Sequence, residues 1–537
     1  MALALKPFRT VEFRAILRIT IVGLTTRLFA LPWAETVNGD ALSRIHLASA
    51  WARSPHWISA DIWPPLHTYV TGASLWLLPW PFVTPVVLNI LFSIGTALGL
   101  WVFTRREFGA KSFASGQGLG EIVVAEHESA SRFVAIAFLL LPLVFRNSLM
   151  ALSEPLYLFL LSLVLVFLAQ ARRASGRLDQ AMLAGLFLTL AAAVRYEVWP
   201  LIPVMALPLW RKPGFALAFG LVALAFPLCW MASSQIQFGD PLYVLNFQSA
   251  DTAKVLARYG GMTPTKQVVR SLFFPMTLFF GMTAGVLGLS LLGVWRSFRE
   301  QAVSLVWLAP FGVLLGLLFY KSISGTLNLD ERYSLALAFL LLPYSAVGLQ
   351  GLGRMHLSQK PLGQAALPTP WVKWFRRLTL LSIFPLGYVL YLAEPLTATW
   401  LQGISRSPAQ QIAPIPRLNP PTRSLIDLVA RHRTREALMV WGFDANQVAH
   451  QVIFYQHLLE PEQLTLSHSL LPHQQETLQH RFLSRHATGL LLVEIAEYPE
   501  LPSLDAPPTV IRFDRFSLEL SPMATDGSGL LYRFRRL

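Results

Sequence analysis

The chain has 537 residues, of which 54% are hydrophobic and only 14% are charged, and its mean hydropathy is +0.48. A soluble domain is nearer a quarter charged, so this composition excludes an ordinary soluble enzyme and a disordered chain. The single cysteine, Cys229, excludes an intrachain disulfide and a cysteine-based metal cluster.

The net charge of +14 is unevenly distributed along the sequence. Residues 1–394 hold 31 lysines and arginines against 17 acidic residues, whereas residues 395–537 hold 13 of each. The excess therefore lies in the apolar part, where it is typical of loops that set membrane topology. We expect no nucleic-acid partner, because the excess does not form a separate basic region.

Membrane-spanning helices need about 20 mostly apolar residues each. Residues 1–394 contain about eleven candidates, near 13–32, 84–104, 132–147, 155–171, 179–194, 199–210, 214–233, 272–295, 303–320, 333–351 and 378–394. The alternate connections carry about 19 and about 10 basic residues, which predicts a cytoplasmic N-terminus. Eleven spans then place the C-terminal part outside the cytoplasm. The expected fold is a mostly α, polytopic bundle in the lipid bilayer.

The first outer connection, residues 32–84, is much longer than a plain turn and holds six tryptophans. Residues 40–52 have helical periodicity after an Asn38-Gly39 start, and Pro64-Pro65 opens a second apolar helix. Both helices are expected at the membrane surface, where tryptophan is favoured.

Two acids of this connection, Asp40 and Asp61, are candidate catalytic residues. A carboxylate there can take the proton from an attacking hydroxyl while a lipid-linked phosphate leaves. The alternative is that each acid only caps its helix. Three histidines, His46, His56 and His67, leave a divalent metal open, although their spacing matches no recognised ligand pattern. No cofactor is assigned.

Charged residues in or beside spans are costly, so they are usually paired or functional. The candidates for substrate binding are Arg27, His67, Glu154, Arg195, Glu197, Lys321, Arg332 and Tyr333. Arginine suits phosphate, because its planar fork binds two oxygens at once. Arg27 either extends outward to the membrane surface or faces a water-filled cavity with Asp40. Simpler alternatives for the others are that Glu154 only favours a helix start and that Arg195 forms a surface pair with Glu197.

The pattern changes after the last candidate span. Residues 395–423 are rich in Pro, Ser and Arg and are predicted to form a linker. Residues 424–537 are predicted to form a small α/β or α+β domain outside the cytoplasm. Its expected strands are 437–442, 490–495, 510–520 and 530–534, with a helix at 444–458.

Several motifs occur in a recognisable order: Arg27, then Asp40, then Asp61 with Pro64–Leu66, then SEPLY at 153–157, VRYEVWP at 194–200 and DERY at 330–333. Over residues 10–395 this order resembles the multi-spanning GT-C-fold glycosyltransferases, the group of protein mannosyltransferases and bacterial lipid-A sugar transferases. The resemblance implies a polyprenyl-phosphate sugar donor, Asp40 as the catalytic acid residue, and Arg195, Arg332 and Lys321 at the donor phosphate.

The expected function is therefore transfer of a hexose or pentose from a polyprenyl phosphate to an unknown glycan, lipid or protein acceptor outside a bacterial inner membrane. Two features depart from the family pattern. Asp40 has no acidic neighbour, and the WWD-type motif of oligosaccharyltransferases is missing, which disfavours protein N-glycosylation. Two alternatives remain open, a multi-spanning transporter or flippase and a polymerase or ligase of surface polysaccharide.

Overall fold

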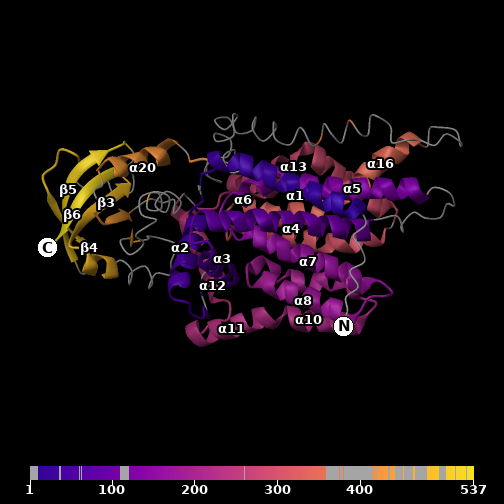
Figure 1. Ribbon diagram of the computed structural model, residues 1–537. Coiled ribbons are helices and arrows are strands. Elements are labelled where there is room, and N and C mark those ends of the chain that lie inside the picture. The colour runs from indigo at the N-terminus through magenta and orange to yellow at the C-terminus, as the bar shows by residue number, and fades with distance from the viewer. Residues whose placement is uncertain are drawn as a thin grey trace.

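The computed structural model describes the helical part of the chain nearly throughout and the C-terminal part in segments (Figure 1). The described residues are 10–35, 38–59, 61, 63–108, 120–258, 261–300, 302–357, 374, 379, 415–418, 420–432, 436–441, 452, 464–465, 480–494, 503–513, 516–527 and 529–537.

Helices dominate residues 10–357, and six of them, or helix pairs, are long and apolar enough to cross a membrane. These are α1 (Thr10–Ala30), α4 (Val83–Glu107), α7 (Glu154–Arg172), the pair α10 (Pro213–Ala223) and α11 (Ala225–Phe238), α13 (Pro264–Arg299) and α14 (Ala309–Ser324). On α1 the outward side chains Phe13, Leu17, Ile21 and Leu28 are exposed and apolar, as lipid contact requires.

Two further spans are bent pairs, α5 (Gly120–Leu140) with α6 (Pro142–Ser148), at 58°, and α15 (Ser334–Leu341) with α16 (Tyr344–Leu357), at 55°. Each bend lies at a proline, Pro142 or Pro343, which has no N–H to continue the helical hydrogen bonds. With both pairs counted, the described residues contain up to eight candidate spans.

The expected count of eleven spans is not confirmed. Residues 179–194 form α8 (Leu178–Ala192), which is apolar but only 15 residues long. Residues 199–210 form only α9 (Leu201–Met205) and the 3-10 turn η4 (Leu207–Leu209), because Pro200, Pro203 and Pro208 interrupt the segment. Apart from Thr379, the candidate at 378–394 lies outside the described residues.

The long first connection folds into the two predicted helices, α2 (Gly39–Arg53) and α3 (Leu66–Leu77), after the 3-10 turn η1 (Leu31–Trp33). Three further 3-10 turns, η3 (Tyr196–Val198), η5 (Val303–Leu308) and η6 (Glu331–Tyr333), and the helix α12 (Tyr243–Arg258) complete the helical part. In Figure 1, α2, α3 and α12 lie at the end of the bundle that faces the C-terminal sheet.

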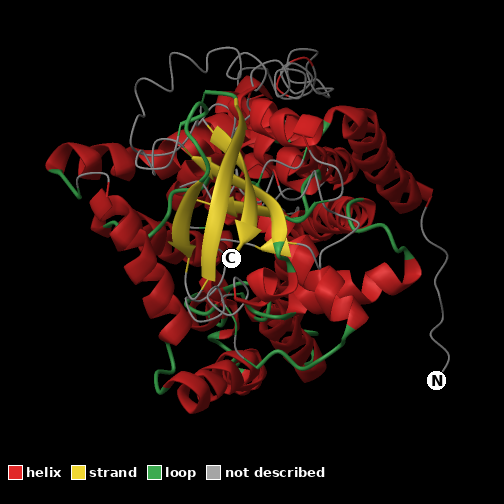
Figure 2. Ribbon diagram, turned by 90° about the vertical axis from the view of Figure 1, so that its left-hand side faces the viewer, coloured by secondary structure: helices red, strands yellow, loops and turns green. Residues whose placement is uncertain are grey.

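The C-terminal part is a six-stranded mixed sheet with the strand order β2-β1-β3-β6-β5-β4. In Figure 2 this sheet faces the viewer, in front of the helical bundle. Its strands are β1 (Leu438–Trp441), β2 (Leu464–Thr465), β3 (Thr488–Glu494), β4 (Thr509–Phe513), β5 (Phe516–Thr525) and β6 (Gly529–Arg536). Strand β1 is parallel to β2 and β3, whereas β3, β6, β5 and β4 pair antiparallel. Helix α20 (Pro420–His432) packs Leu425, Leu428 and Val429 against one face of the sheet.

The prediction of strands at 437–442, 490–495 and 530–534 is confirmed by β1, β3 and β6. The single strand expected at 510–520 is wrong, because the structure has two paired strands there, β4 and β5, with Phe513 opposite Phe516. Two consecutive strands with similar apolar alternation read in the sequence like one continuous strand. The helix expected at 444–458 lies, except for Val452, outside the described residues.

Glu35 joins the bundle to the C-terminal part. Its backbone N–H donates to the Pro416 carbonyl at 2.9 Å, and its Oε2 accepts from the backbone N–H of Leu418 at 2.5 Å. The other carboxylate oxygen pairs with Arg423 in α20. The segment that leads into α2 is therefore attached to the chain just before the sheet.

Candidate functional site

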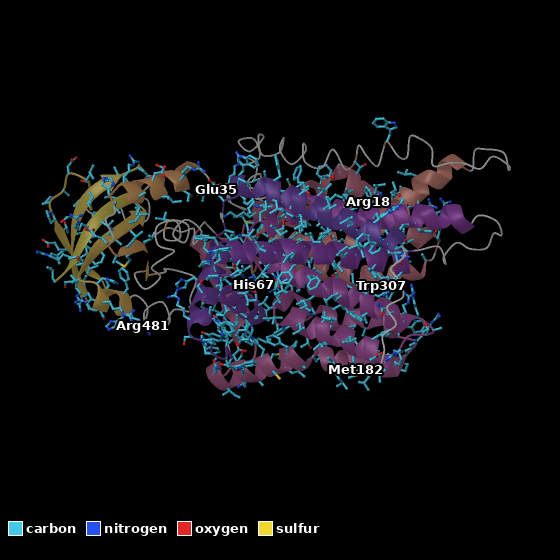
Figure 3. The ribbon with its side chains drawn as sticks, in the orientation of Figure 1. Arg18, Glu35, His67, Met182, Trp307 and Arg481 are labelled. Carbon is cyan, nitrogen blue, oxygen red and sulfur yellow. The ribbon has the colours of Figure 1, made fainter. Side chains whose placement is uncertain are left out.

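Four segments that are far apart in the sequence bring charged side chains together. They are the starts of α2 and α7 and the turns η3 and η6. Figure 3 shows His67, a neighbour of this group, at the end of the bundle nearest the sheet, whereas Trp307 lies towards the other end.

Asp40 lies in the first turn of α2. The helix is capped by Asn38, whose side chain accepts a hydrogen bond from the Asp40 N–H at 2.9 Å, so the alternative that Asp40 itself is the cap is wrong. The Asp40 side chain is 34% exposed, and its Oδ2 accepts a hydrogen bond from Arg332 Nη2. Packing fixes this helix against the segment before α7, through Ala41, Leu42 and Ile45 on Met150, Ala151 and Leu152.

Glu154 is the first residue of α7, and its side chain is only 2% exposed. The Asn89 side chain holds the preceding segment by donating to the carbonyls of Met150, at 2.6 Å, and Leu152, at 2.8 Å. Glu154 Oε1 accepts from Arg195 Nη1 and lies 3.7 Å from Arg332 Nε. This one buried carboxylate therefore joins two arginines.

Arg195 forms a two-point pair with Glu197 in η3, with Nε and Nη2 at 3.0 and 2.7 Å from the two carboxylate oxygens. Its side chain is 10% exposed, so the pair with Glu197 exists but the alternative that it is only an exposed surface pair is wrong. Burial lowers the pKa of Arg195, but Glu154 and Glu197 raise it further, to above its ordinary value. Burial raises the pKa of Glu197, and the charge and hydrogen bonds of Arg195 more than offset this and lower it to about 2. The pair is thus ionised on both sides.

Arg332 lies in η6, which Asp330 caps by accepting the Arg332 N–H at 3.1 Å. The second Asp330 oxygen is 3.0 Å from Arg332 Nε. The Tyr333 ring lies beside both arginines, with its centroid 5.3 Å from the Arg195 guanidinium carbon and 5.7 Å from that of Arg332. We call the connected set Asp40, Arg332, Glu154, Arg195 and Glu197 the ion-pair network.

The network combines two chemical capacities. Asp40 is its most exposed carboxylate, so it is the member that can exchange a proton with a bound molecule. Behind it lie guanidinium groups of the kind that bind phosphate or carboxylate oxygens.

Two more of the predicted residues lie near the network. Lys321, in the last turn of α14, is close enough to Glu197 to contribute to its lowered pKa. The backbone carbonyl of Asp61 accepts from the Tyr196 hydroxyl at 3.3 Å. Burial raises the pKa of Tyr196, and the charge of Asp61 adds to this effect. Because Pro65 occupies the N-cap position of α3, the alternative that Asp61 caps that helix is wrong.

His67 lies on α3 and is buried. Burial, with the nearby positive charge of Arg44, holds the pKa of its imidazole well below the ordinary value, so the ring is neutral. Arg27 lies elsewhere: its guanidinium donates to Ser148 Oγ at 3.1 Å and to the Leu139 carbonyl at 2.8 Å, at the bend between α5 and α6. Its side chain is fully buried, so the alternative that it extends to the membrane surface is wrong, and these partners lie at this bend and not at Asp40.

Sequence reasoning missed two arginines of this region. Arg44 is buried on α2, four residues after Asp40. This spacing places both side chains on one face of the helix, so it would have marked Arg44 as a candidate site residue. Arg146 on α6 lies 3.8 Å from Glu331, with both side chains buried, and no spacing in the sequence indicates that pair. Within the described ranges, no three His, Cys, Asp or Glu side chains are grouped so as to hold a metal ion.

No protein-family model and no curated protein matches the chain. Among solved structures it is similar to the crystal structure of ArnT from Cupriavidus metallidurans bound to undecaprenyl phosphate, with a TM-score of 0.60 at 13% sequence identity over 98% of each chain. The same protein in the apo state matches with a TM-score of 0.55 at 14% identity, again over 98% of both chains. The GT-C fold predicted from the motif order is therefore confirmed.

Proposed function

We propose that this chain is a membrane glycosyltransferase that moves a sugar from a polyprenyl-phosphate donor to an acceptor outside the cytoplasm. The observation that carries the proposal is the contact between Asp40, a partly exposed carboxylate, and the largely buried guanidinium of Arg332. The shared fold supports it, because ArnT has been crystallised with undecaprenyl phosphate.

In the proposed reaction, a hydroxyl of the acceptor attacks the sugar carbon that carries the phosphate. Asp40 accepts the hydroxyl proton as the new carbon–oxygen bond forms. The bond between the sugar carbon and the phosphate oxygen breaks, and its electron pair leaves with the phosphate. Positive charge from Arg332, Arg195 and Lys321 stabilises the leaving phosphate, while Glu154 and Glu197 keep the arginines in place.

The other predicted residues take supporting roles in this proposal. Asp61 is the second candidate base, and Tyr333 and His67 line the substrate side of the network. We assign Arg27 a structural role, since it satisfies a carbonyl that the α5–α6 bend leaves without its helical partner. We also propose that residues 1–394 form the transferase bundle and that residues 424–537 form a separate unit beyond the linker predicted at 395–423, of which residues 420–423 are the first turn of α20.

The experiment is a transfer assay with the purified full chain in detergent. Radiolabelled hexoses and pentoses on polyprenyl phosphate serve as donors, and a total cell-envelope extract serves as the acceptor mixture. We expect label to move from the lipid phase into the extract and free polyprenyl phosphate to accumulate. Arg53→Gln, an exposed change on the same helix as Asp40, is the matched control and should retain transfer. A folded parent protein that moves no label from any donor would contradict the proposal.

A further inference from the structure

Arg44 is a buried guanidinium with unused hydrogen-bond donors. The residue is 3% exposed, and its Nε and Nη1 have no hydrogen-bond partner among the described residues. Leaving a buried donor unpaired is costly, and more so for a charged group. An unpaired, buried cation beside the ion-pair network indicates a binding point for an anionic ligand, which would accept hydrogen bonds from these donors.

The surroundings of Arg44 keep it charged. Burial lowers the pKa of this guanidinium, to about 10, while Glu154 and Asp40 act in the opposite direction, so it is still protonated at neutral pH. Its guanidinium carbon lies 4.6 Å from the centroid of the Trp63 ring, a cation–π contact that uses none of its N–H groups.

The other two arginines of the site are already engaged. Arg195 directs its Nε and both terminal nitrogens at Glu197 and Glu154. Arg332 donates a hydrogen bond to Asp40 through Nη2, and its Nε, which makes no hydrogen bond among the described residues, is ion-paired with Asp330. A phosphate that bound to Arg195 would have to displace a carboxylate, and one that bound to Arg332 would compete with Asp40 and Asp330 for its charge. Arg44, by contrast, has two unpaired N–H groups and no ion pair among the described residues.

A second unpaired donor lies nearby. The Tyr157 hydroxyl is buried on α7, one turn after Glu154, and has no hydrogen-bond partner in the described part of the chain. Its electrostatic neighbours are Glu197, Arg195 and Glu154, so it lies beside the ion-pair network. A neutral O–H is a suitable donor for a phosphate oxygen.

We propose that Arg44 binds the phosphate of the lipid-linked donor through its Nε–H and Nη1–H groups, with the Tyr157 hydroxyl as an additional donor. The inference rests on the proposed function and makes it specific, since it assigns direct phosphate contact to Arg44 and a supporting, carboxylate-bound position to Arg195 and Arg332.

The test measures binding and transfer with the full chain in detergent. The binding probes are polyprenyl phosphate without sugar and, separately, inorganic phosphate, which distinguish a lipid headgroup from free phosphate. We expect Arg44→Gln to weaken binding of polyprenyl phosphate by roughly tenfold or more, because two charge-assisted hydrogen bonds are lost. Arg44→Lys, which keeps the charge and loses the fork, should fall in between, and Tyr157→Phe should show a smaller loss.

Arg53→Gln on the same helix is the control and should bind as the parent does. If the parent transfers sugar and both Arg44 variants bind polyprenyl phosphate like the parent, the phosphate role of Arg44 is refuted. If the parent transfers no sugar but binding still depends on Arg44, the phosphate site stands and the proposed transferase reaction fails. Equal losses with inorganic phosphate and with polyprenyl phosphate would assign the site to phosphate alone, without a lipid requirement. Arg44→Lys keeps the test decisive should Arg44→Gln fail to fold.

Discussion

Arg332 and Asp40 are 292 positions apart in the sequence, yet Nη2 of the arginine donates a hydrogen bond to Oδ2 of the aspartate. The contact connects η6, near the end of the described bundle, to the helix that follows the first span. A carboxylate held by a largely buried guanidinium has a fixed orientation, which a general base requires. Glu154 extends the same contact to Arg195, so one change in this set affects several elements.

Asp40→Asn tests the base directly. The amide keeps the shape of the side chain, and Asn38 still caps the helix, so the protein should fold. The proton acceptor is lost, and we expect sugar transfer to fall by about a hundredfold or more. Asp61→Asn is the comparison: if it is inactive while Asp40→Asn transfers at the parent rate, the base is Asp61. The measurement is the initial rate of label transfer at matched protein levels.

Arg195→Lys tests the buried two-point pair. Lysine keeps the positive charge but cannot bind both oxygens of Glu197 and one of Glu154 at once. We expect a loss of about 1–3 kcal/mol of stability together with weaker donor use. Arg177→Lys is the matched control, because Arg177 pairs with Asp179 at 2.6 Å on an exposed surface, where a pair contributes under about 1 kcal/mol. Equal midpoints of thermal unfolding for the two variants would show that the burial of Arg195 does not matter.

The burial of His67 predicts a pH dependence of stability. Its pKa in the folded protein is well below the ordinary value, whereas in the unfolded chain it returns to about 6.5. Between these values the unfolded state binds more protons, so the free energy of unfolding should decrease as the pH falls below about 6.5. His67→Gln should reduce this decrease, and His56→Gln, at an exposed position, should leave it unchanged. Thermal unfolding of the parent and both variants across this range is the measurement.

The residues of the site were predictable where a local motif carried them. Glu154 follows a span boundary, Arg195 and Glu197 lie two positions apart, and Asp330 to Tyr333 precede a span, so each stood out as charge in an apolar context. Their assembly was not predictable from spacing alone, because it depends on how helices far apart in sequence pack. The same limitation hid the pair of Arg146 and Glu331, which joins two such helices.

The sequence also did not reveal which of the charged side chains are buried. Arg195 with Glu197 has the pattern of an exposed pair, and only the fold reveals that Glu154 and the Tyr333 ring cover it. Arg27 has the position of a residue that reaches the membrane surface, and its actual partner, the Leu139 carbonyl, exists because α5 bends at Pro142. Amphipathic patterns predict which face of a helix is buried, but not which neighbour buries it.

Glu35→Ala is expected to loosen the C-terminal part. The carboxylate of Glu35 accepts the Leu418 N–H at 2.5 Å, so removing it frees the peptide bond between Arg417 and Leu418. Trypsin should then cut after Arg417 several-fold faster, because cleavage needs local opening. Arg423→Gln, which removes only the exposed ion pair with Glu35, should change the rate little. Mass spectrometry of the fragments measures the cut, and an unchanged rate in Glu35→Ala would show that the attachment lies elsewhere.

The last prediction concerns topology. The basic connections that hold Arg105, Arg172 and Lys212 are expected on the cytoplasmic side by the excess of positive charge. Arg172 is paired with Glu107 at 2.9 Å, and Lys212 donates to the Ala171 carbonyl at 2.9 Å, so these connections gather at one end of the bundle. In Figure 3 the labelled Trp307, which donates to Glu107, lies at that end, while His67 and Glu35 lie at the other, next to the sheet. We therefore expect a reporter that is active only in the cytoplasm to stay silent when fused after Leu537 and to be active when inserted at residue 176. The opposite pattern, an active fusion at Leu537 and a silent one at 176, would invert the orientation and place the ion-pair network on the cytoplasmic side.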